Sequence, residues 1–422
     1  MHTSLLKDTF FNLCGSIVPA LVAIPALGYA ARELNTALFG MTMLILAVVG
    51  YASIFDAGLG KAVVRHISIY RDKKSNHGKI LGTGLVFVLI SGGGACLIVF
   101  SSARVLALSV FNVEQSYLSA CVQGIQIGAF CIPSFLAGLV LQSYLEGVQE
   151  FRSFNVYRAT SGILSYLFPV IALALFGTFQ MYIVGLLAAR MTSLFLIISI
   201  VSHRLPISQW RFSFRIMKEL FRFGSWLTVT NIISPFMVYM DRFIIAKLTG
   251  PQSVAFYTAP GELVNRMSIL PVSISRAVFP RLAATQFAFF TAKSTQKTAY
   301  LFMLLFITPI VLFGFIFSPI LITAWLGESY ANAPVDIFRI LLIGFLFNSI
   351  ALIPYSNLQA NGLSSLTAKI HLVEVLPYFA ILVAAVKFYD IVGASVIWSI
   401  RMFFDMLIML YFDTRKSSMV NR

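Results

Sequence analysis

Long apolar runs, most of them about 20 residues or more, follow one another along almost the whole 422-residue chain. A helix rises about 1.5 Å per residue, so a run of about 20 residues crosses a hydrocarbon core of about 30 Å. Inside lipid the backbone must satisfy its own hydrogen bonds, which favours helices. Charged residues make up only 11% of the chain, whereas a soluble domain has about 25%. The sequence therefore excludes a soluble globule and predicts an all-α integral membrane protein.

The apolar pattern predicts about twelve transmembrane helices in two sets of six. The first set is expected at residues 9–31, 39–60, 80–100, 119–145, 159–177 and 179–201. The second set is expected at residues 223–248, 253–279, 298–320, 336–359, 368–388 and 391–412. The two sets begin alike, with Lys7-Asp8-Thr9-Phe10 and Lys218-Glu219-Leu220-Phe221. Parallel repeats of this kind surround a central cavity in many transporters, and we expect that arrangement here.

A basic segment separates the two sets. Its basic residues recur at intervals of four, three and four: Arg211, Arg215, Lys218 and Arg222. This spacing aligns them on one helical face and predicts an amphipathic helix on the inner leaflet, although a solvated linker is the alternative. The predicted domains are an N-terminal six-helix bundle (1–203), a cytoplasmic amphipathic connector (204–222), a C-terminal six-helix bundle (223–412) and a cytoplasmic tail (413–422).

Lysine and arginine gather in alternate loops, around residues 61–79, 152–158, 204–222, 276–297 and 415–422. The intervening loops hold only Arg32, Arg104, Lys247 and Lys387. The positive-inside rule then places the basic loops and both termini in the cytoplasm. The net charge of +15 thus indicates topology and contact with anionic membrane lipids, and we expect no nucleic acid partner.

The cysteines and the N-terminus are expected to be structural. Cys14, Cys96, Cys121 and Cys131 all fall in apolar runs without CxxC spacing, so the sequence predicts no disulfide, no metal site and no cofactor. The apolar stretch at 9–31 is longer than that of a signal peptide and is interpreted as a retained first helix.

Two stretches carry a family resemblance. The stretch from Tyr51 to Gly60, Tyr-Ala-Ser-Ile-Phe-Asp-Ala-Gly-Leu-Gly, is followed by Arg65 and resembles the Asp-Phe-Gly-Leu signature that ends the second helix of polysaccharide flippases. The stretch from Tyr239 to Gly250, which contains Asp241-Arg242, is similar to the seventh helix of the same proteins. These are the Wzx-type O-antigen exporters of the MOP superfamily.

The resemblance implies a MATE-like, V-shaped pair of bundles whose cavity opens alternately to each side of a bacterial cytoplasmic (inner) membrane. It implies a cargo of oligosaccharide repeat units linked by pyrophosphate to undecaprenol, used in lipopolysaccharide biosynthesis. It also implies export coupled to cation or proton movement, as in an antiporter. The expected partners are this lipid-linked oligosaccharide, membrane lipids, a polysaccharide polymerase and a chain-length regulator.

Ionisable residues inside the predicted spans are the candidates for function, because each costs about 2.5–3.5 kcal/mol at a helix centre unless it has a partner or a wet cavity. They are Asp56, Asp241, Glu262, Glu374, Asp405, Arg190, Arg242, Arg266, Arg339 and Arg401. Three of the possible pairs lie three or four residues apart on one helix and are expected to be local: Glu262–Arg266, Arg401–Asp405 and Asp336–Arg339. His371 one turn before Glu374 is a further pair or a proton relay.

Cationic side chains in the cavity are expected to bind the pyrophosphate, because a guanidinium grips phosphate oxygens with two hydrogen bonds and stays charged when buried. The candidates are Arg242, Arg266 and Arg190. Asp56, Asp241 and Glu262 are the candidates for ion coupling. Pairing between helices is the alternative role for the three arginines, Asp56 and Asp241, and a local pair with Arg266 is the alternative for Glu262. Proline kinks helices, so the hinge candidates are Pro19, Pro25, Pro235 and Pro260, with fixed kinks as the alternative.

Three other classes of protein fit the sequence less well. A membrane polymerase or ligase is disfavoured because the longest outer loops, around 101–118 and 321–335, are short and carry no catalytic motif. The glycines at 92–94 lie in mid-span and are expected to permit close helix packing. A drug or organic-cation exporter would favour cavity carboxylates without matching arginines. A membrane scaffold would have little use for ionisable residues at depth.

Overall fold

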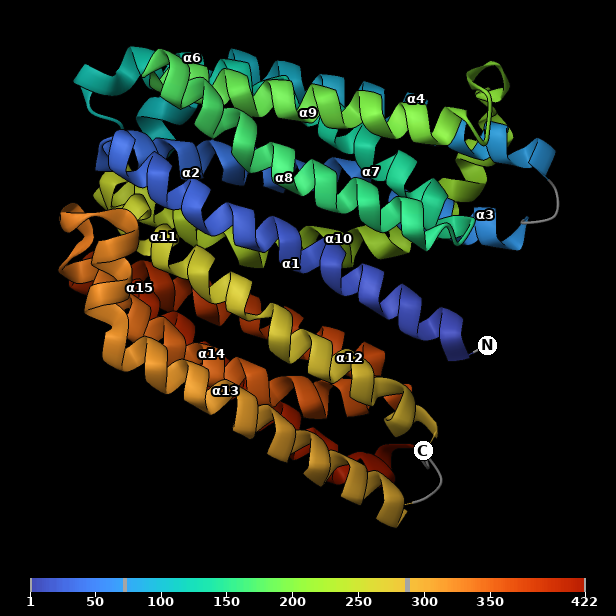
Figure 1. The fold of residues 1–422 in the computed structure, drawn as a ribbon. Coiled ribbons are helices and arrows are strands. Elements are labelled where there is room, and N and C mark those ends of the chain that lie inside the picture. Colours follow the sequence, from blue (N-terminus) through green and yellow to red (C-terminus); the bar gives the residue numbers. More distant parts are fainter. Residues whose placement is uncertain (1, 71–73, 285–288, 421–422) are drawn as a thin grey trace. The chain divides into compact units, whose positions relative to one another are not determined.

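The computed structural model describes the backbone of residues 2–70, 74–284 and 289–420. Within these ranges side chains are described except at 2–14, 16, 74–75, 223–235, 280–284, 289–293, 295, 364 and 416–420. All regular secondary structure in the described part is helical (Figure 1). The chain divides into two compact units, Met1–Gln252 and Ser253–Arg422.

The first unit is a bundle of long helices. They are α1 (His2–Glu33), α2 (Thr36–Tyr51), α3 (Leu59–Ile69), α4 (Lys74–Ser101), α5 (Ala103–Val105), α6 (Gln115–Ala129), α7 (Cys131–Gly147), α8 (Phe151–Phe176), α9 (Phe179–Ser202) and α10 (Phe214–Thr249). Three short turns join them: η1 (Ala52–Asp56), η2 (Leu106–Val110) and η3 (Ile207–Gln209). Helix α8 packs between α1 and α9, and α7 packs against α3, α4 and α9. A large core cluster lies around α7, with Leu136, Val140 and Leu141 fully buried.

The second unit starts with a long, bent helical path. Its elements are α11 (Pro251–Met267), α12 (Ile269–Ala284), α13 (Phe289–Leu326), η4 (Glu328–Tyr330), α14 (Ala333–Ala360) and α15 (Ser364–Val420). Helix α15 consists of two segments that meet at Asp390, whose φ of 53° and ψ of −147° are not helical. Helix α14 packs against α12, α13 and α15. At one end of the unit Asp413 accepts hydrogen bonds from Asn357 (2.6 Å) and Gln296 (2.7 Å), which ties α13, α14 and α15 together.

Each of the twelve predicted ranges falls on helical backbone. Eight helical stretches are long and apolar enough to cross a membrane within the described residues, and one of them, Ser365–Arg415, covers both segments of α15. The prediction of an all-α, multi-pass membrane protein is confirmed. The predicted division into bundles of six helices stays a prediction, as does the cavity predicted between them.

Several predicted helices are interrupted where the sequence analysis drew them unbroken. The range 39–60 stops at Asp56, because Ala57 (φ 49°) and Gly58 (φ 74°) adopt left-handed conformations. The range 119–145 breaks at Phe130 and the range 253–279 at Ser268. Helix α3 was missed altogether, because its buried face of Leu59, Val63 and Ile67 lies in a stretch assigned to a basic loop. A break of one turn in the backbone changes the mean hydropathy of a run of about 20 residues too little to be detected from the sequence.

The loops predicted to be cytoplasmic come together at one end of the first unit. Ser68 donates a hydrogen bond to the carbonyl of Gly147 (3.2 Å), and Arg204 forms an ion pair with Glu150 (3.0 Å). At the other end Asn35, in a predicted outer loop, hydrogen-bonds to the Tyr117 hydroxyl (3.1 Å). Within this unit the alternation of basic and outer loops therefore agrees with the helix packing.

The connector lies across the start of α4, where two glycines leave room for it. A Cβ on Gly82 would lie 2.5 Å from the Arg211 backbone nitrogen, and a Cβ on Gly78 would meet the carbonyl oxygen of Gln209. The Arg211 amide donates to the Gly78 carbonyl at 3.2 Å. The helix begins only at Phe214, as the first turns of α10, so Arg211 precedes it. The four basic residues of the connector are nevertheless exposed as the pattern predicted.

The glycines at 92–94 differ in role. Gly92 packs tightly, since a Cβ there would lie 3.0 Å from Leu136 and 3.2 Å from Pro133. Gly93 and Gly94 have nothing within 4 Å of such a Cβ. Close helix packing thus accounts for one glycine of the three.

Candidate functional site

A small cavity in the first unit collects polar side chains from three helices. Its volume is about 90 Å³, and its lining includes Gln142 of α7, Tyr157, Arg158 and Ser161 of α8, and Arg190 and Ser193 of α9. A water molecule takes about 30 Å³ in the liquid. The cavity therefore has room for a small polar group such as a phosphate.

Arg190 is the centre of this cavity. Its guanidinium lies over the Phe135 ring, with the Cζ atom 5.0 Å from the ring centroid, a distance at which the ring attracts the cation. The Nε atom is buried and has no hydrogen-bond partner among the described residues, and the same holds for the Ser193 hydroxyl. A buried N–H donor without an acceptor is costly. The arrangement suits an anion with several oxygens, such as a phosphate group.

Arg158 adds a second positive charge at the rim of the cavity. Its side chain is exposed, whereas its neighbour Tyr157 is buried, with 6% of its surface accessible. Gly138 leaves room for the Tyr157 hydroxyl, because a Cβ there would lie 3.2 Å from it. The sequence analysis assigned Arg158 to a cytoplasmic loop. The signal it missed is the spacing of Tyr157, Arg158 and Ser161, which fall within one turn of a helix.

A larger cavity of about 340 Å³ lies in the second unit, lined by residues of α12 and α13 such as Ile274, Val278 and Phe302. Its described lining includes the hydroxyls of Ser294 and Thr298 but no charged side chain. An apolar groove of this kind has no means of selecting an anion. We therefore place the candidate site at Arg190.

Asp241 and Arg242, adjacent on α10, are both buried, with 8% and 7% of their surfaces accessible. The Asp241 Oδ1 atom accepts a hydrogen bond from the Arg242 backbone amide (2.8 Å), and the Arg242 guanidinium lies 5.4 Å from the Tyr239 ring centroid. Tyr239 in turn fits against Gly50 of α2, where a Cβ would lie 2.6 Å from its hydroxyl. These contacts all lie within the first unit, and none of these residues lines the cavity around Arg190. The predicted contact between Arg242 and the cargo stays a prediction.

Asp56 sits where the backbone reverses between η1 and α3. Its carboxylate accepts a hydrogen bond from the Gly60 amide, 3.1 Å from either oxygen. Asp56 is the last residue of η1, and its carboxylate satisfies an otherwise unpaired N–H of the first turn of α3 and lies near the positive end of that helix. A Cβ on Gly60 would lie 3.3 Å from the Asp56 carboxylate and 3.1 Å from the Ser143 hydroxyl, so this glycine permits the close approach. The motif that carried the family resemblance is thus a helix start.

The local pairs in the second unit differ in part from those predicted. Arg266 and Glu262 form the expected ion pair on α11, with Nη2 and Oε2 3.2 Å apart, and Arg339 pairs with Asp336 at 3.5 Å. The described structure has no ion pair within 4 Å between Arg401 and Asp405, although the Arg401 charge still acts on the Asp405 carboxylate. Arg401 Nε lies 3.9 Å from Glu374 of the preceding segment of α15 instead. Spacing on one helix says nothing about a carboxylate that approaches from a neighbouring helix.

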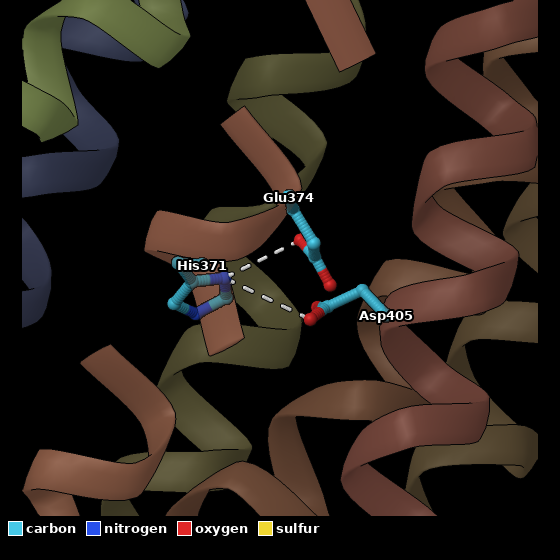
Figure 2. Close-up of side chains that lie close together, drawn as sticks. All are labelled: His371, Glu374 and Asp405. Carbon is cyan, nitrogen blue, oxygen red and sulfur yellow. Dashed lines mark ion pairs between the residues drawn. The ribbon is translucent and has the colours of Figure 1, made fainter. Parts of the chain in front are cut away.

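His371 lies between two carboxylates in the second unit. Its Nδ1 atom is 3.7 Å from Glu374 Oε2 and 3.7 Å from Asp405 Oδ1 (Figure 2). The sequence analysis paired His371 with Glu374 but did not bring Asp405 to them. No pattern in a single sequence joins positions 371 and 405.

The hinge candidates lie inside helices. Pro19 and Pro25 fall within α1, and Pro260 falls within α11. The side chain of Pro235 lies outside the described residues. Each of these prolines removes one backbone donor from its helix, and their part in any motion stays a prediction.

The fold is similar to that of solved transporters. A multidrug resistance MATE family transporter of the MOP superfamily in an inward-facing conformation superimposes with a TM-score of 0.76 at 12% identity, over 98% of this chain and 95% of that one. A MOP superfamily transporter from Pyrococcus furiosus superimposes with a TM-score of 0.68 at 13% identity, over 99% and 96%. The class defined by these helices is therefore a multi-pass helical membrane fold similar to that of these transporters.

The sequence comparison gives the family. The model of the family described as polysaccharide biosynthesis protein matches residues 5–286, and the chain belongs to this family. A Shigella flexneri protein named "Putative O-antigen transporter" is 37% identical over 98% of this chain and 99% of its own length. The Bacillus subtilis membrane protein EpsK, uncharacterized, is 25% identical over 81% and 69%. The resemblance to polysaccharide export proteins inferred from two short motifs is confirmed at the level of this family.

Proposed function

We propose that this protein exports lipid-linked oligosaccharide repeat units of the O-antigen type across the bacterial cytoplasmic membrane by alternating access, with both termini in the cytoplasm. The observation that carries the proposal is the arginine cavity in the first unit, in a chain 37% identical along its full length to a protein named for O-antigen transport. The cargo implied by the family is a pyrophosphate attached to undecaprenol.

The cavity supports a phosphate as the contact group. Arg190 offers a buried Nε–H, and Arg158, Ser161 and Ser193 add charge and hydroxyls within a volume of about 90 Å³. A guanidinium replaces part of the hydration that a phosphate loses when it leaves water. On this proposal the sugar head and the polyprenyl tail remain outside this space.

The membrane potential favours the proposed direction. With the cell interior negative, outward movement of an anion is favourable by about 2.3 kcal/mol per charge per 100 mV. Inward return of a proton adds to this driving force. On the proposed function a polysaccharide polymerase and a chain-length regulator consume the exported units.

The test is genetic complementation. A host strain that lacks the gene is expected to lose surface polysaccharide and to accumulate lipid-linked repeats on the cytoplasmic face. The wild-type gene should restore export. Arg190→Ala should reduce it about tenfold to a hundredfold, because a hydrogen bond to a charged group contributes about 1.5–3 kcal/mol. Arg190→Lys, which keeps the charge but loses the planar fork, should give an intermediate level.

Arg104→Ala is the matched control, because Arg104 is an exposed arginine of the same unit outside the cavity. It should export like the wild type at equal protein levels. Full export by Arg190→Ala would remove Arg190 from the transport path. Unaltered surface polysaccharide in the deletion strain, together with increased sensitivity to cationic drugs, would favour the drug-exporter alternative that the MATE fold allows.

A further inference from the structure

The side-chain cluster formed by His371, Glu374, Arg401 and Asp405 is the densest group of ionisable residues among the described residues of the second unit. The first two lie on the segment of α15 before Asp390 and the last two on the segment after it. Figure 2 shows the side chains of His371 and Glu374 pointing toward Asp405 from a neighbouring helix. The cluster therefore joins the two segments of α15 at a point well inside a stretch long enough to span the membrane.

The members of the cluster are close but do not hydrogen-bond to one another. One imidazole nitrogen and one oxygen from each carboxylate lie within 4.8 Å of one another. His371 Nδ1, both oxygens of Glu374, Arg401 Nε and Asp405 Oδ1 are buried and without a hydrogen-bond partner in the described structure. Asp405 has only 7% of its surface accessible. An unpartnered, buried carboxylate oxygen directed at an imidazole is a strong acceptor site for a proton.

Counting charges gives the number of cations that the cluster needs. Two carboxylates and one guanidinium leave a net charge of −1 when His371 is neutral, and an uncompensated charge at this depth is costly. The other ionisable groups around the cluster, Tyr378 over the Arg401 guanidinium (5.0 Å) and Tyr355 beside His371 (6.1 Å between rings), are neutral phenols. One added positive charge makes the cluster neutral, and a second would leave it with a net charge of +1.

A proton fits this requirement better than a metal ion. Calcium and magnesium bind mainly oxygen ligands, about six or more of them, whereas the cluster consists of two carboxylates and an imidazole nitrogen. Arg401, with its Nε 3.9 Å from Glu374, is a fixed cation that repels a second one. An imidazole, in contrast, gains and loses a proton near neutral pH.

We propose that His371, Glu374 and Asp405 bind one proton in the second unit, with Arg401 balancing the remaining negative charge, and that this is the proton returned during export. The second half of this inference rests on the proposed function. With the proton bound, the imidazolium attracts both carboxylates and holds the two segments of α15 together. Without it the carboxylates repel each other, and Arg401, one turn from Asp405 on the same helix, is free to turn toward that residue.

The first experiment measures the proton itself. The full chain, purified and reconstituted in vesicles containing phosphatidylglycerol, is titrated with a pH indicator to count protons taken up around neutral pH. Asp405→Asn and Glu374→Gln each remove the net charge of −1, and both should take up one proton fewer than the wild type. His371→Gln should shift that uptake to lower pH. The control Asp336→Asn, in an exposed local pair with Arg339, should match the wild type.

Equal proton uptake by the wild type, Asp405→Asn and Glu374→Gln would overturn the site. Because the two variants remove the charge from different segments, either one gives the answer if the other fails to fold. Addition of Na⁺ or Zn²⁺ at constant pH should leave the bound proton in place. Its stoichiometric release by one of these ions would show a metal site instead.

The second experiment asks whether the proton is used. In the deletion strain Asp405→Asn and Glu374→Gln should restore surface polysaccharide about tenfold less well than the wild type, in the range of ordinary coupling energies, and Asp336→Asn should restore it fully. Proton uptake without any effect of the gene on surface polysaccharide would refute the proposed function and leave the proton site standing. Full export by both charge-removing variants would refute the coupling role alone.

Discussion

Asp56 is a buried residue whose carboxylate accepts a hydrogen bond from a backbone amide. Sequence reasoning made it a candidate for ion coupling because no oppositely charged residue lies one turn away. Its partner is instead a backbone amide, that of Gly60, which a count of side-chain charges does not include. The coupling role of Asp56 stays a prediction, and the capping geometry gives a way to separate the two roles.

Asp56→Asn is expected to keep both export and stability. The oxygen of the asparagine side chain can still accept the hydrogen bond from the Gly60 amide, so the start of α3 is retained while the charge is lost. Asp56→Ala should lower the free energy of unfolding by about 1.5–3 kcal/mol, the usual net contribution of a hydrogen bond to a charged group. Thermal unfolding in detergent and surface polysaccharide are the two measurements. Normal folding of Asp56→Asn without export would instead assign the carboxylate to the transport cycle.

Tyr330 gives the chain a sensitivity to alkali. The side chain is fully buried against Phe256, with ring centroids 5.3 Å apart, and burial raises the pKa of its hydroxyl. The unfolded chain loses this proton as the pH rises through about 10, whereas the folded chain retains it. The folded state then binds more protons, so the free energy of unfolding falls as the pH rises above that value.

Tyr330→Phe should weaken this alkaline loss of stability. The measurement is the slope of the unfolding midpoint against pH above about pH 10, compared with the slope near neutral pH. An unchanged alkaline slope in the variant would mean that other tyrosines account for it.

Among the elements, α4 is the support on which the connector rests. The contact depends on Gly82, where an added methyl group would meet backbone atoms of Trp210 and Arg211 at 2.5–2.9 Å. These backbone atoms cannot move away by a change of rotamer, as the end of a long side chain can. Helix α4 also supplies the Thr83 hydroxyl, which accepts a hydrogen bond from the Ser213 amide at 2.9 Å.

Gly82→Ala is therefore expected to destabilise the protein by about 1–3 kcal/mol, the usual cost of overpacking. Gly93→Ala on the same helix is the control, because nothing lies within 4 Å of its added Cβ. It should be neutral or stabilising by up to about 1 kcal/mol, since alanine is the better helix former. The measurement is the unfolding midpoint of each variant, which should be lower for Gly82→Ala than for Gly93→Ala. Equal midpoints would show that the connector does not need this close contact.

The existence of the long helices could be predicted from the sequence, but their breaks could not. A run of apolar residues reports burial or lipid contact over many turns. The left-handed Ala57 and the reversal at Asp390 each depend on one residue and on what packs around it. The same limit applies to the sites. Glu262 and Arg266 were predictable because one helix spaces them, whereas Arg158 beside Arg190 and Asp405 beside His371 required the packing of different helical segments.

At the scale of the whole molecule, the charge distribution predicts how the chain is threaded through the membrane. The basic loops that meet at one end of the first unit are expected to face the cytoplasm, and so are both termini. Reporter fusions after residue 70 and after the C-terminus should be active only with a cytoplasmic reporter, and fusions near residues 34 and 112 only with an external one. External activity after residue 70 would invert the whole topology.

Helix α10 ends at Thr249 and packs on α2, α3 and α4, so the first compact unit reaches Gln252 and includes the helix that the charge pattern assigned to the second half. A gene divided at residue 203 would separate this helix from the surfaces that bury it, whereas a gene divided after residue 252 would keep them in one polypeptide. Anyone who wishes to produce the first half alone, or to reassemble the transporter from two fragments, should therefore cut at the later position.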